Sequence, residues 1–402
     1  MTIFKNIKFF LVIIVSGIFI LSSCNKDLPD PGDITVVPPT GLSIAETIAA
    51  NPNDSLYYKV ILKSGLVNQL TNKALVFTLF VPDNTAMIAS GLTNAVITSA
   101  GFTAATAQGI VNYNTIGQAL PSSAIVTSFP NMQMPTEIGL DPTNPLVRLS
   151  IFPSRRGNSF WVNNVPLTAV DQITANGVIH HTAFVVAPPT KLLAQGIYAD
   201  PNLTYFTAAV ARADSGQVGL NRIDSLLKYG VTNMTILAPN NAAFQTLLFG
   251  IIYSSLIAQG VPPATAAATA TALSSSPTVF SNPALYAAMP ASTVRGILVY
   301  HILATQAFGA YSPNARAFSV NFAPSPGQFV QTLVNTAFPA HPGIRAVATF
   351  TGPFVTNLQF TGLGTFPPGG LPYSGPAATA VSIDNHAVNG VYHIIDKVLL
   401  PQ

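Results

Sequence analysis

The sequence predicts an α+β protein that contains two copies of one domain in tandem. Three short motifs occur twice, in the same order, and their copies lie 157, 187 and 213 residues apart. The pairs are 78–84 with 235–241, 109–114 with 296–301, and 176–180 with 389–393. The shared order indicates a duplication, and a chain of 402 residues is long enough for two or three domains.

The first motif predicts a buried strand that is followed directly by a helix. Residues 78–81 are a short apolar, β-prone run. Pro82 ends the strand because proline offers no amide hydrogen to the ladder. Asp83 or Asn84 can then cap a helix beginning at Thr85 by accepting a free backbone N–H. The second copy repeats this arrangement with Pro239, Asn240 and Asn241.

The third motif predicts a tight turn that leads into an alternating strand. Asn176-Gly177 and Asn389-Gly390 are strong hairpin-turn dipeptides. Side chains in the strand that follows alternate between two faces. In the second copy, one face carries Val391, His393 and Ile395, and the other carries Tyr392, Ile394 and Asp396.

These motifs resemble the fasciclin domain. The most specific stretch is 389–401, NGVYHIIDKVLLP, and it follows the strand motif at 235–241 and the pair Tyr300-His301 in the family's order. The first copy matches less closely. Asn114 stands where the family favours a histidine after tyrosine, and the last strand of this copy lacks the usual aspartate.

The resemblance covers 41–190 and 197–402, and it implies two compact wedges, each with two packed β-sheets and helices along one side. It also implies structural roles for the residues that match the motif. These are Pro82, Asn84, Tyr113, Asn176, Gly177, His180, Pro239, Asn241, Tyr300, His301, Asn389, Gly390, His393 and Asp396.

The growing spacing between the motif copies places extra residues in the second domain, near 249–283 and 323–376. The first insertion contains an Ala/Thr/Ser run at 261–277, and the second is dense in Pro, Gly and Phe. We predict loops or loop-like excursions for both, because Gly and Pro interrupt regular structure.

Residues 1–23 are typical of a secretory signal peptide. Lys5 and Lys8 precede an apolar run at 9–21, which is shorter than the ~20 residues that a spanning helix needs. The sequence LSSC, ending at Cys24, resembles the lipobox of bacterial lipoproteins. In that family the cysteine receives a diacylglycerol and the new amino terminus is usually acylated, with palmitate expected here. An ordinary cleaved signal and an uncleaved anchor are the alternatives.

Residues 24–40 form a Pro-rich tether, with four prolines among residues 25–40, and such segments act as semi-rigid spacers. Lys26-Asp27 loosely resembles a tag that sends some Gram-negative lipoproteins to the outer face of the outer membrane, and a plain polar stalk is equally open. We expect an exported protein, lipid-anchored to the outer membrane. Surface-facing and periplasmic positions both stay open.

Charge and motif content argue against several functions. Without residues 1–23 the chain has fifteen Lys and Arg against fourteen acids, and its largest basic cluster is Arg155-Arg156, so we expect no nucleic-acid partner. Asp384 and Asp396, on neighbouring predicted strands, are the best candidates for a carboxylate pair, but little supports one. His386 and His393 lack an evident third ligand. We therefore predict no catalytic residue, no metal and no cofactor.

One aromatic cluster is a candidate ligand contact. Phe160 and Trp161 lie beside Arg155 and Arg156 in a hairpin predicted for 152–165. Exposed rings there could stack on sugars. The alternative is that the rings fill the core of a protein in which only 8% of residues are charged.

Fasciclin domains are mostly adhesion or interaction modules without a shared catalytic centre. The resemblance therefore implies a surface-anchored, non-catalytic adhesion lipoprotein that binds extracellular protein or polysaccharide, including matrix components. The alternative is an accessory glycan-binding lipoprotein of a nutrient-uptake complex.

Overall fold

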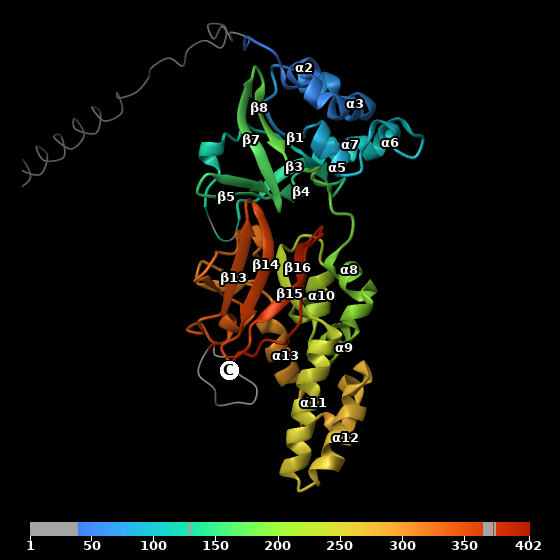
Figure 1. Ribbon diagram of the computed structural model, residues 1–402, viewed down its shortest axis with the longest axis vertical. Coiled ribbons are helices and arrows are strands. Elements are labelled where there is room, and N and C mark those ends of the chain that lie inside the picture. The colour runs from blue at the N-terminus through green and yellow to red at the C-terminus, as the bar shows by residue number, and fades with distance from the viewer. Residues whose placement is uncertain (1–38, 128, 130, 365–372, 374) are drawn as a thin grey trace, which may run out of the picture. The chain divides into compact units, whose positions relative to one another are not determined.

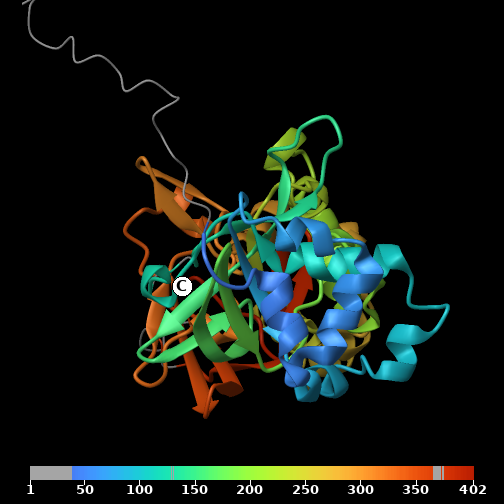
Figure 2. The same ribbon diagram turned by 90° about the horizontal axis from the view of Figure 1, so that it is seen from above.

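The computed structural model describes residues 39–402, apart from 128, 130, 365–372 and 374. Residues 41–402 form one compact unit, shown from two sides in Figures 1 and 2. The signal peptide, Cys24 and nearly all of the tether lie outside the described residues. The predictions about them therefore stay predictions.

The first repeat, residues 41–190, combines short helices with one curled sheet. Its helices are α2 (Ile44–Ala50), α3 (Ser55–Ser64), α4 (Val67–Thr71), α5 (Asn84–Ala89), α6 (Asn94–Thr98) and α7 (Ala104–Tyr113). Its strands are β1 (Phe77–Pro82), β2 (Thr115–Ile116), β3 (Met134–Gly139), β4 (Arg148–Ile151), β5 (Pro153–Arg156), β6 (Ser159–Val162), β7 (Val165–Thr174) and β8 (Gly177–Thr182).

These strands hydrogen-bond in the order β4-β3-β2-β1-β8-β7-β6-β5. At the centre, β1 and β8 run parallel with Phe77 beside Gly177, and the neighbours on either side run antiparallel. The two ends of the row, β4 and β5, are separated in sequence by Phe152 alone. The sheet must therefore bend back on itself, which produces two packed layers from one row of strands.

The second repeat, residues 197–402 together with the start of α8 at Leu193, follows the same plan. Its helices are α8 (Leu193–Ala199), α9 (Thr204–Ala213), α10 (Ile223–Lys228), α11 (Asn241–Ala258), α12 (Pro263–Ser274) and α13 (Ala291–Tyr300). Its strands are β9 (Met234–Pro239), β10 (Thr305–Ala307), β11 (Ala310–Ser312), β12 (Gln328–Val330), β13 (Ile344–Thr351), β14 (Phe354–Thr361), β15 (Ala378–Ala387) and β16 (Gly390–Ile395).

The main sheet of the second repeat has the order β12-β13-β14-β15-β16-β9. Strands β9 and β16 run parallel with Met234 beside Gly390, in the places of β1 and β8. Strand β13 pairs with both β12 and β14. It therefore takes the place of two strands of the first repeat, β4, which pairs with β3, and β5, which pairs with β6. The two repeats are thus one architecture used twice, and the α+β prediction is confirmed.

Strands β1 and β9 confirm the strand predicted from the first motif, and every residue in both is buried. Asp83 caps the following helix by accepting the N–H of Ala86 at 2.8 Å, and Asn240 does the same for Ala243 at 2.8 Å. Since Asp83 itself is the cap, α5 begins at Asn84, one residue before the predicted start.

Each central strand separates two hydrophobic clusters. In β1, Leu79 and Val81 pack against the helices, whereas Phe80 faces the other layer of the sheet with Tyr113 and Ile151. In β9, Ile236 faces the helices, and Leu237 faces the cluster of the sheet. A strand covered on both faces needs apolar residues at consecutive positions, which is why these segments do not alternate.

The loop prediction for 249–283 is wrong. Helix α11 continues to Ala258, and α12 packs beside it as an antiparallel pair, visible in Figure 1 beyond the sheet of the second repeat. Alanine is the strongest helix former, so an Ala-rich run favours helix despite its low complexity. Ala266 and Ala270 are fully buried, and their small size allows the two helices to pack closely.

Helix α11 is long and apolar enough to cross a membrane by length and composition, which among the described residues holds for this helix alone. Phe244, Leu248 and Ile252 on it belong to the hydrophobic core of the second repeat. One such helix is weak evidence for a membrane span, because core helices of soluble proteins have the same composition.

The loop prediction for 323–376 is wrong where three strands lie. Strands β12, β13 and β14 lie within it, and in β13 Ile344, Ala346 and Ala348 alternate with less buried residues. That is the period of a half-buried strand. The glycines and prolines stand mainly in the connections, as at Gly352, where φ is 59° between β13 and β14.

Gly177 is expected to tolerate no side chain. Its φ is +145°, and a Cβ would lie 1.8 Å from the carbonyl oxygen of Phe77, which pairs with it across β1 and β8. We expect Gly177→Ala to lower the free energy of unfolding by about 3 kcal/mol or more, since both strain and a steric clash result.

Gly157→Ala is the matched control, because Gly157 has a φ of +57° with open space around its Cβ position. That change should lower the free energy of unfolding by only about 1–2 kcal/mol, the penalty for placing alanine in a left-handed conformation. Urea unfolding of both variants measures the difference. Equal losses would contradict the clash.

Candidate functional site

Asn176 joins three chain segments at the turn before the last strand of the first repeat. Its Oδ1 accepts the backbone N–H of Ile44 at 2.7 Å, and its Nδ2 donates to the carbonyls of Leu70 and Asn72 at 3.0 and 3.2 Å. Asn389 makes the corresponding bonds, at 2.8, 2.9 and 3.1 Å, with Leu193, Leu227 and Tyr229. Both amides are buried and satisfy backbone groups that would otherwise lack partners.

A second set of hydrogen bonds, formed by His180, Asp171 and Ser122 and called here the His–Asp–Ser clasp, joins β7 to β8 in the first repeat. His180 Nδ1 accepts the backbone N–H of Asp171 at 3.2 Å, and His180 Nε2 lies 2.8 Å from the carbonyl of Leu120. These partners require the neutral ring with its proton on Nε2. The Asp171 carboxylate accepts the backbone N–H of Ser122 at 2.7 Å and also its hydroxyl.

The second repeat contains the same clasp. His393 Nδ1 accepts the N–H of Asp384 at 3.2 Å, and Nε2 lies 3.0 Å from the carbonyl of Ala317. Asp384 accepts the N–H and hydroxyl of Ser319 at 2.6 and 2.5 Å. Both aspartates adopt a left-handed backbone, with φ of 62° for Asp171 and 58° for Asp384, which bends β7 and β15 at the same point.

Burial lowers the pKa of both clasp histidines, His180 and His393, even though an aspartate lies close to each. Their two ring nitrogens are already bonded within the fold. Neither ring therefore offers a free nitrogen for proton transfer or metal binding, and their contacts are structural.

The tyrosines of the second motif anchor helix ends to the sheet. Tyr113 donates to the carbonyl of Ser150 at 3.2 Å, and Tyr300 donates to that of Gly343 at 2.7 Å. Burial raises the pKa of both phenols. Each hydroxyl is therefore a permanent donor at physiological pH.

Asn114 and His301 follow these tyrosines and fill equivalent places with different chemistry. Asn114 Nδ2 donates to the carbonyls of Ile110 and Val186 at 2.8 and 2.9 Å. His301 Nδ1 lies 2.8 Å from the carbonyl of Ile297, and Nε2 accepts the N–H of Leu399 at 2.9 Å. Both join the helix end to the C-terminal segment of their repeat. Asn114 thus departs from the family pattern but still joins the end of its helix to the C-terminal segment of the repeat.

The other motif residues also bond within the fold. Asn84 Oδ1 accepts the N–H of Leu56 at 2.9 Å, and Asn241 does the same for Tyr205 at 3.1 Å. Asp396 accepts the N–H of Thr379 at 2.7 Å. Pro82 and Pro239 are the last residues of β1 and β9, and Gly390 opens β16 as Gly177 opens β8.

Strands β5 and β6 form the hairpin predicted for 152–165, and this hairpin contacts the second repeat. Trp161 is only 2% exposed; its Nε1 donates to the carbonyl of Pro353 at 2.8 Å, and its ring lies 6.3 Å from that of Phe350. The Arg156 guanidinium lies 4.7 Å from the Phe350 ring and donates to the carbonyl of Phe322 at 2.7 Å. Trp161 and Arg156 therefore join the two repeats.

Phe160 and Arg155 lie farther out on the hairpin, with the guanidinium 5.3 Å from the ring centre. Arg156 and Trp161 border a cavity of about 480 Å³ together with Thr349 and Phe350. Because Trp161 is covered, a ligand could reach at most its edge. The contact predicted for Phe160, Trp161, Arg155 and Arg156 stays a prediction.

Phe308 is an exposed aromatic residue for which the sequence analysis predicts no role. It lies at the two-residue turn between β10 and β11, with a φ of 51° followed by 81° at Gly309. Positive φ at both positions defines a type I′ turn, which favours Asn-Gly. The Phe308 side chain is fully exposed, at 110% of the reference value. A Phe-Gly pair between short β-prone runs was the signal available in the sequence.

The acidic pair and the histidine pair singled out in the sequence have different bonding partners in the described structure. Among the described residues, no group of three or more His, Cys, Asp or Glu could hold a metal ion. Asp384 bonds Ser319, whereas Asp396 pairs with Lys397 at 3.3 Å. His386 packs on Phe318, with ring centres 5.1 Å apart. These groups thus have separate partners.

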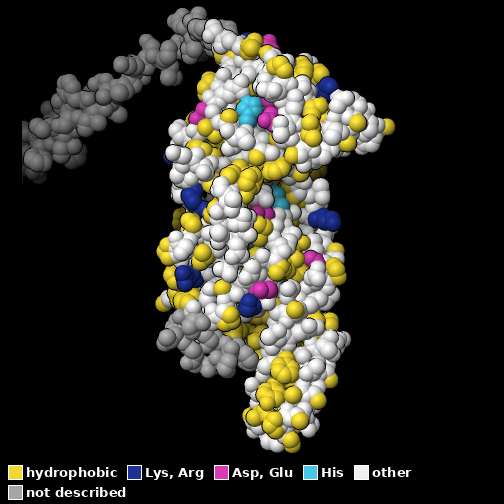
Figure 3. Space-filling model, viewed as in Figure 1, with side chains coloured by type: hydrophobic (Ala, Val, Ile, Leu, Met, Phe, Trp, Pro, Cys, Tyr) yellow, Lys and Arg dark blue, Asp and Glu magenta, His cyan; other side chains and the backbone are white. Residues whose placement is uncertain are grey.

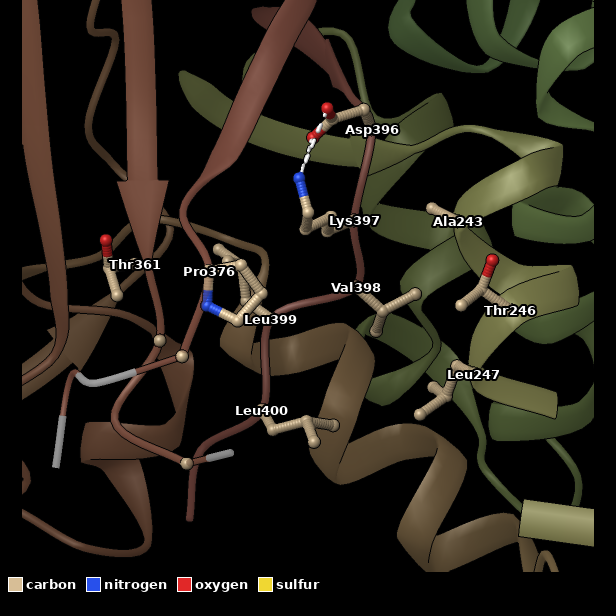
Figure 4. A pocket seen from close by; sticks show the side chains of 13 residues that line it. Ala243, Thr246, Leu247, Thr361, Pro376, Asp396, Lys397, Val398, Leu399 and Leu400 are labelled. Carbon is tan, nitrogen blue, oxygen red and sulfur yellow. Dashed lines mark hydrogen bonds and ion pairs between the residues drawn. The ribbon is translucent and has the colours of Figure 1, made fainter. Parts of the chain in front are cut away.

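The surface itself is charge-poor. On the face shown in Figure 3, charged side chains appear as isolated patches, and apolar atoms gather over the α11–α12 pair. A pocket of about 280 Å³ lies between the start of α11 and the C-terminal segment (Figure 4). Leu247 and Val398 line it, and its charged groups, Asp396 and Lys397, neutralise each other.

Comparison with known proteins agrees with this geometry. Residues 52–188 match the family model described as the Fasciclin domain. The second repeat has the same central strand pair, the same hydrogen bonds from an asparagine at the turn, and the same His–Asp–Ser clasp. The family match lies within the first repeat, and the second repeat shares the architecture of the first. A solved FAS1 domain pair from the insect cell adhesion molecule Fasciclin I is similar at 15% identity, over 87% of this chain and 98% of that chain, with a TM-score of 0.32. No curated protein matches the sequence.

The second repeat should lose stability in mild acid through His301. Burial lowers the pKa of His301 to about 4 from its ordinary 6.5. Between these values the unfolded chain binds the extra proton, so stability is complete above pH 6.5 and falls as the pH drops toward 4. The loss from this group is at most about 3 kcal/mol.

His301→Asn, which copies Asn114, should flatten that pH dependence, and Asn114→His should add a similar one to the first domain. Urea unfolding between pH 7 and pH 4 measures both slopes. An unchanged slope in His301→Asn would show that other groups, such as His386 or His393, dominate.

Proposed function

We propose that the protein is a surface-anchored, non-catalytic adhesion or interaction lipoprotein that binds extracellular protein or polysaccharide. The observation that carries this proposal is the match of residues 52–188 to the Fasciclin domain, whose members are mostly adhesion and interaction modules. The lipobox-like residues before Cys24 supply the anchor, and the Pro-rich segment up to residue 40 supplies the spacer.

The polar chemistry of the domains supports a non-catalytic role. The rings of His180, His301 and His393 each bond to the backbone through both nitrogens. A general base needs a nitrogen within reach of a substrate proton. These histidines, which the family motif contributes, are instead used to hold the fold.

Phe308 gives the proposal a specific contact. A bulky residue at positive φ carries a conformational cost, and such strain persists where the site serves binding. Exposed aromatic rings are frequent hot spots at protein interfaces, and they also stack on sugars. The β10–β11 turn therefore presents a ring that serves either type of partner.

Phe308→Asn should separate adhesion from stability. Asparagine suits the type I′ turn, so the variant should be as stable as the parent or more stable by about 0.5–1 kcal/mol. Attachment of cells displaying the variant to a matrix-coated surface should fall severalfold. Phe338→Asn is the matched control, because Phe338 is 65% exposed and does not belong to this turn.

Full attachment by the Phe308 variant would exclude this contact. Growth on complex polysaccharides, measured in the same cells, tests the nutrient-uptake alternative. Unchanged attachment with lost growth would replace adhesion by that role. Deleting 323–376 is unsuitable for such a test, since it removes β12, β13 and β14.

The anchor has its own test. Cys24→Ser removes the thiol that would receive the lipid, and a single remaining chain at most would give marginal membrane binding. We expect the variant to move from the membrane fraction to the soluble fraction, and protease treatment of intact cells to shave the parent protein. Retention of Cys24→Ser in the membrane would overturn lipid anchoring at this residue.

A further inference from the structure

Arg316 is a buried cation at the boundary between the repeats. It is 3% exposed, and its two terminal nitrogens donate to the carbonyls of Ala387 and Val388 at 3.1 and 2.9 Å. Its guanidinium lies 4.8 Å from the ring centre of Phe152 in the first repeat. His386 Nε2 lies 3.1 Å from Nη1 and acts as an acceptor, so that ring is neutral.

No carboxylate among the described residues lies within ion-pair distance of Arg316, and its buried Nε has no hydrogen-bond partner there. Burial lowers the pKa of Arg316 to about 10, which leaves it charged at neutral pH. A buried charge without a counter-charge is costly, because the field of the ion is no longer screened by water. The site therefore favours an anion.

A pocket of about 390 Å³ adjoins Arg316 between the two repeats, and its volume lies within the usual range for small-molecule sites. Asn233 also lines it and contributes a second unpartnered atom, the buried acceptor Oδ1. The amide nitrogen of Asn233 is occupied, since it donates to Gln133 Oε1 at 3.0 Å. Gln133 in turn donates to Ser150 Oγ at 2.9 Å, which fixes the orientation of both amides.

The other cation of the pocket is already neutralised. Arg148 lies 3.0 Å from the carboxylate of Glu137, so the uncompensated charge at the pocket is that of Arg316. A positive charge and an unpaired acceptor that line one pocket suit a ligand with one carboxylate and one hydroxyl. A phosphate fits less well, because its oxygens would carry more negative charge and would repel Asn233 Oδ1.

We propose that this inter-repeat pocket binds a hydroxycarboxylate of the sugar-acid class, with the carboxylate on Arg316 and a hydroxyl donating to Asn233 Oδ1. This pocket is inferred from its own contacts alone and does not depend on anchoring or adhesion. If the ligand comes from an acidic polysaccharide, the inference rests on the proposed function, whereas a free sugar acid as the ligand does not require that function.

Calorimetric titration of the full chain with glucuronate tests the site, and glucose serves as the ligand without a carboxylate. We expect saturable binding of glucuronate and none of glucose. Asn233→Asp adds a carboxylate to the pocket and should weaken glucuronate binding at least about tenfold through charge repulsion. A melting curve accompanies the titration, because the change also removes the amide that donates to Gln133. Asn53→Asp adds the same charge at an exposed position and should bind like the parent.

Arg316→Gln should also abolish binding, and Asn233→Asp keeps the test decisive if that variant fails to fold. Absence of glucuronate binding, equal binding of glucose, or unchanged affinity in Asn233→Asp would overturn the proposal. Oligogalacturonate distinguishes the sources: tighter binding than the monomer indicates a polymer, and equal binding indicates the free acid. Loss of this site would leave the attachment result for Phe308 unaffected.

Discussion

The parallel pairing of the first and last strands is the interaction on which each domain depends. β1 pairs with β8 and β9 pairs with β16, and both pairs lie in the sheet with apolar clusters on either face. The chain must close a long loop before either pair can form, which costs conformational entropy. Asn176 and Asn389 stabilise the closed state, because each bonds the entering helix and the end of a second helix, α4 or α10, to the same turn.

The scarcity of charge shapes the rest of the molecule. With 8% charged residues, the protein stabilises its interior through neutral side chains that bond to backbone groups. The clasp histidines and the buried tyrosines follow this rule, whereas Arg316, Asp54 and Asp214 are buried residues that depart from it. Because the surface also has few charges, recognition must depend on shape, exposed rings and hydrogen bonds. Phe308 and the inter-repeat pocket are two of the places where the described structure offers such features.

Local features were predictable where the chemistry is local. The strand that ends at Pro82, the cap at Asp83 or Asn84 and the hairpin containing Trp161 follow from turn and capping rules. The structure confirms the strand and the cap within one residue and the hairpin within three. The Ala-rich run at 261–277 was predicted as a loop because low complexity was given more weight than the helix propensity of alanine. The strands at 344–351 and 354–361 were missed because nearby glycines and prolines concealed their alternation.

The sequence by itself determined the duplication, the order of strand, helix and turn in each copy, and the motif residues, since each depends on neighbours within a few positions. It also determined the near balance of charge and the single cysteine. Only the tertiary structure decided that Trp161 is covered by the second repeat, that Arg316 lacks a carboxylate among the described residues, and that Phe308 is fully exposed. Burial and pairing of these residues depend on segments more than a hundred positions away or on the fold of the whole unit, which no local pattern encodes.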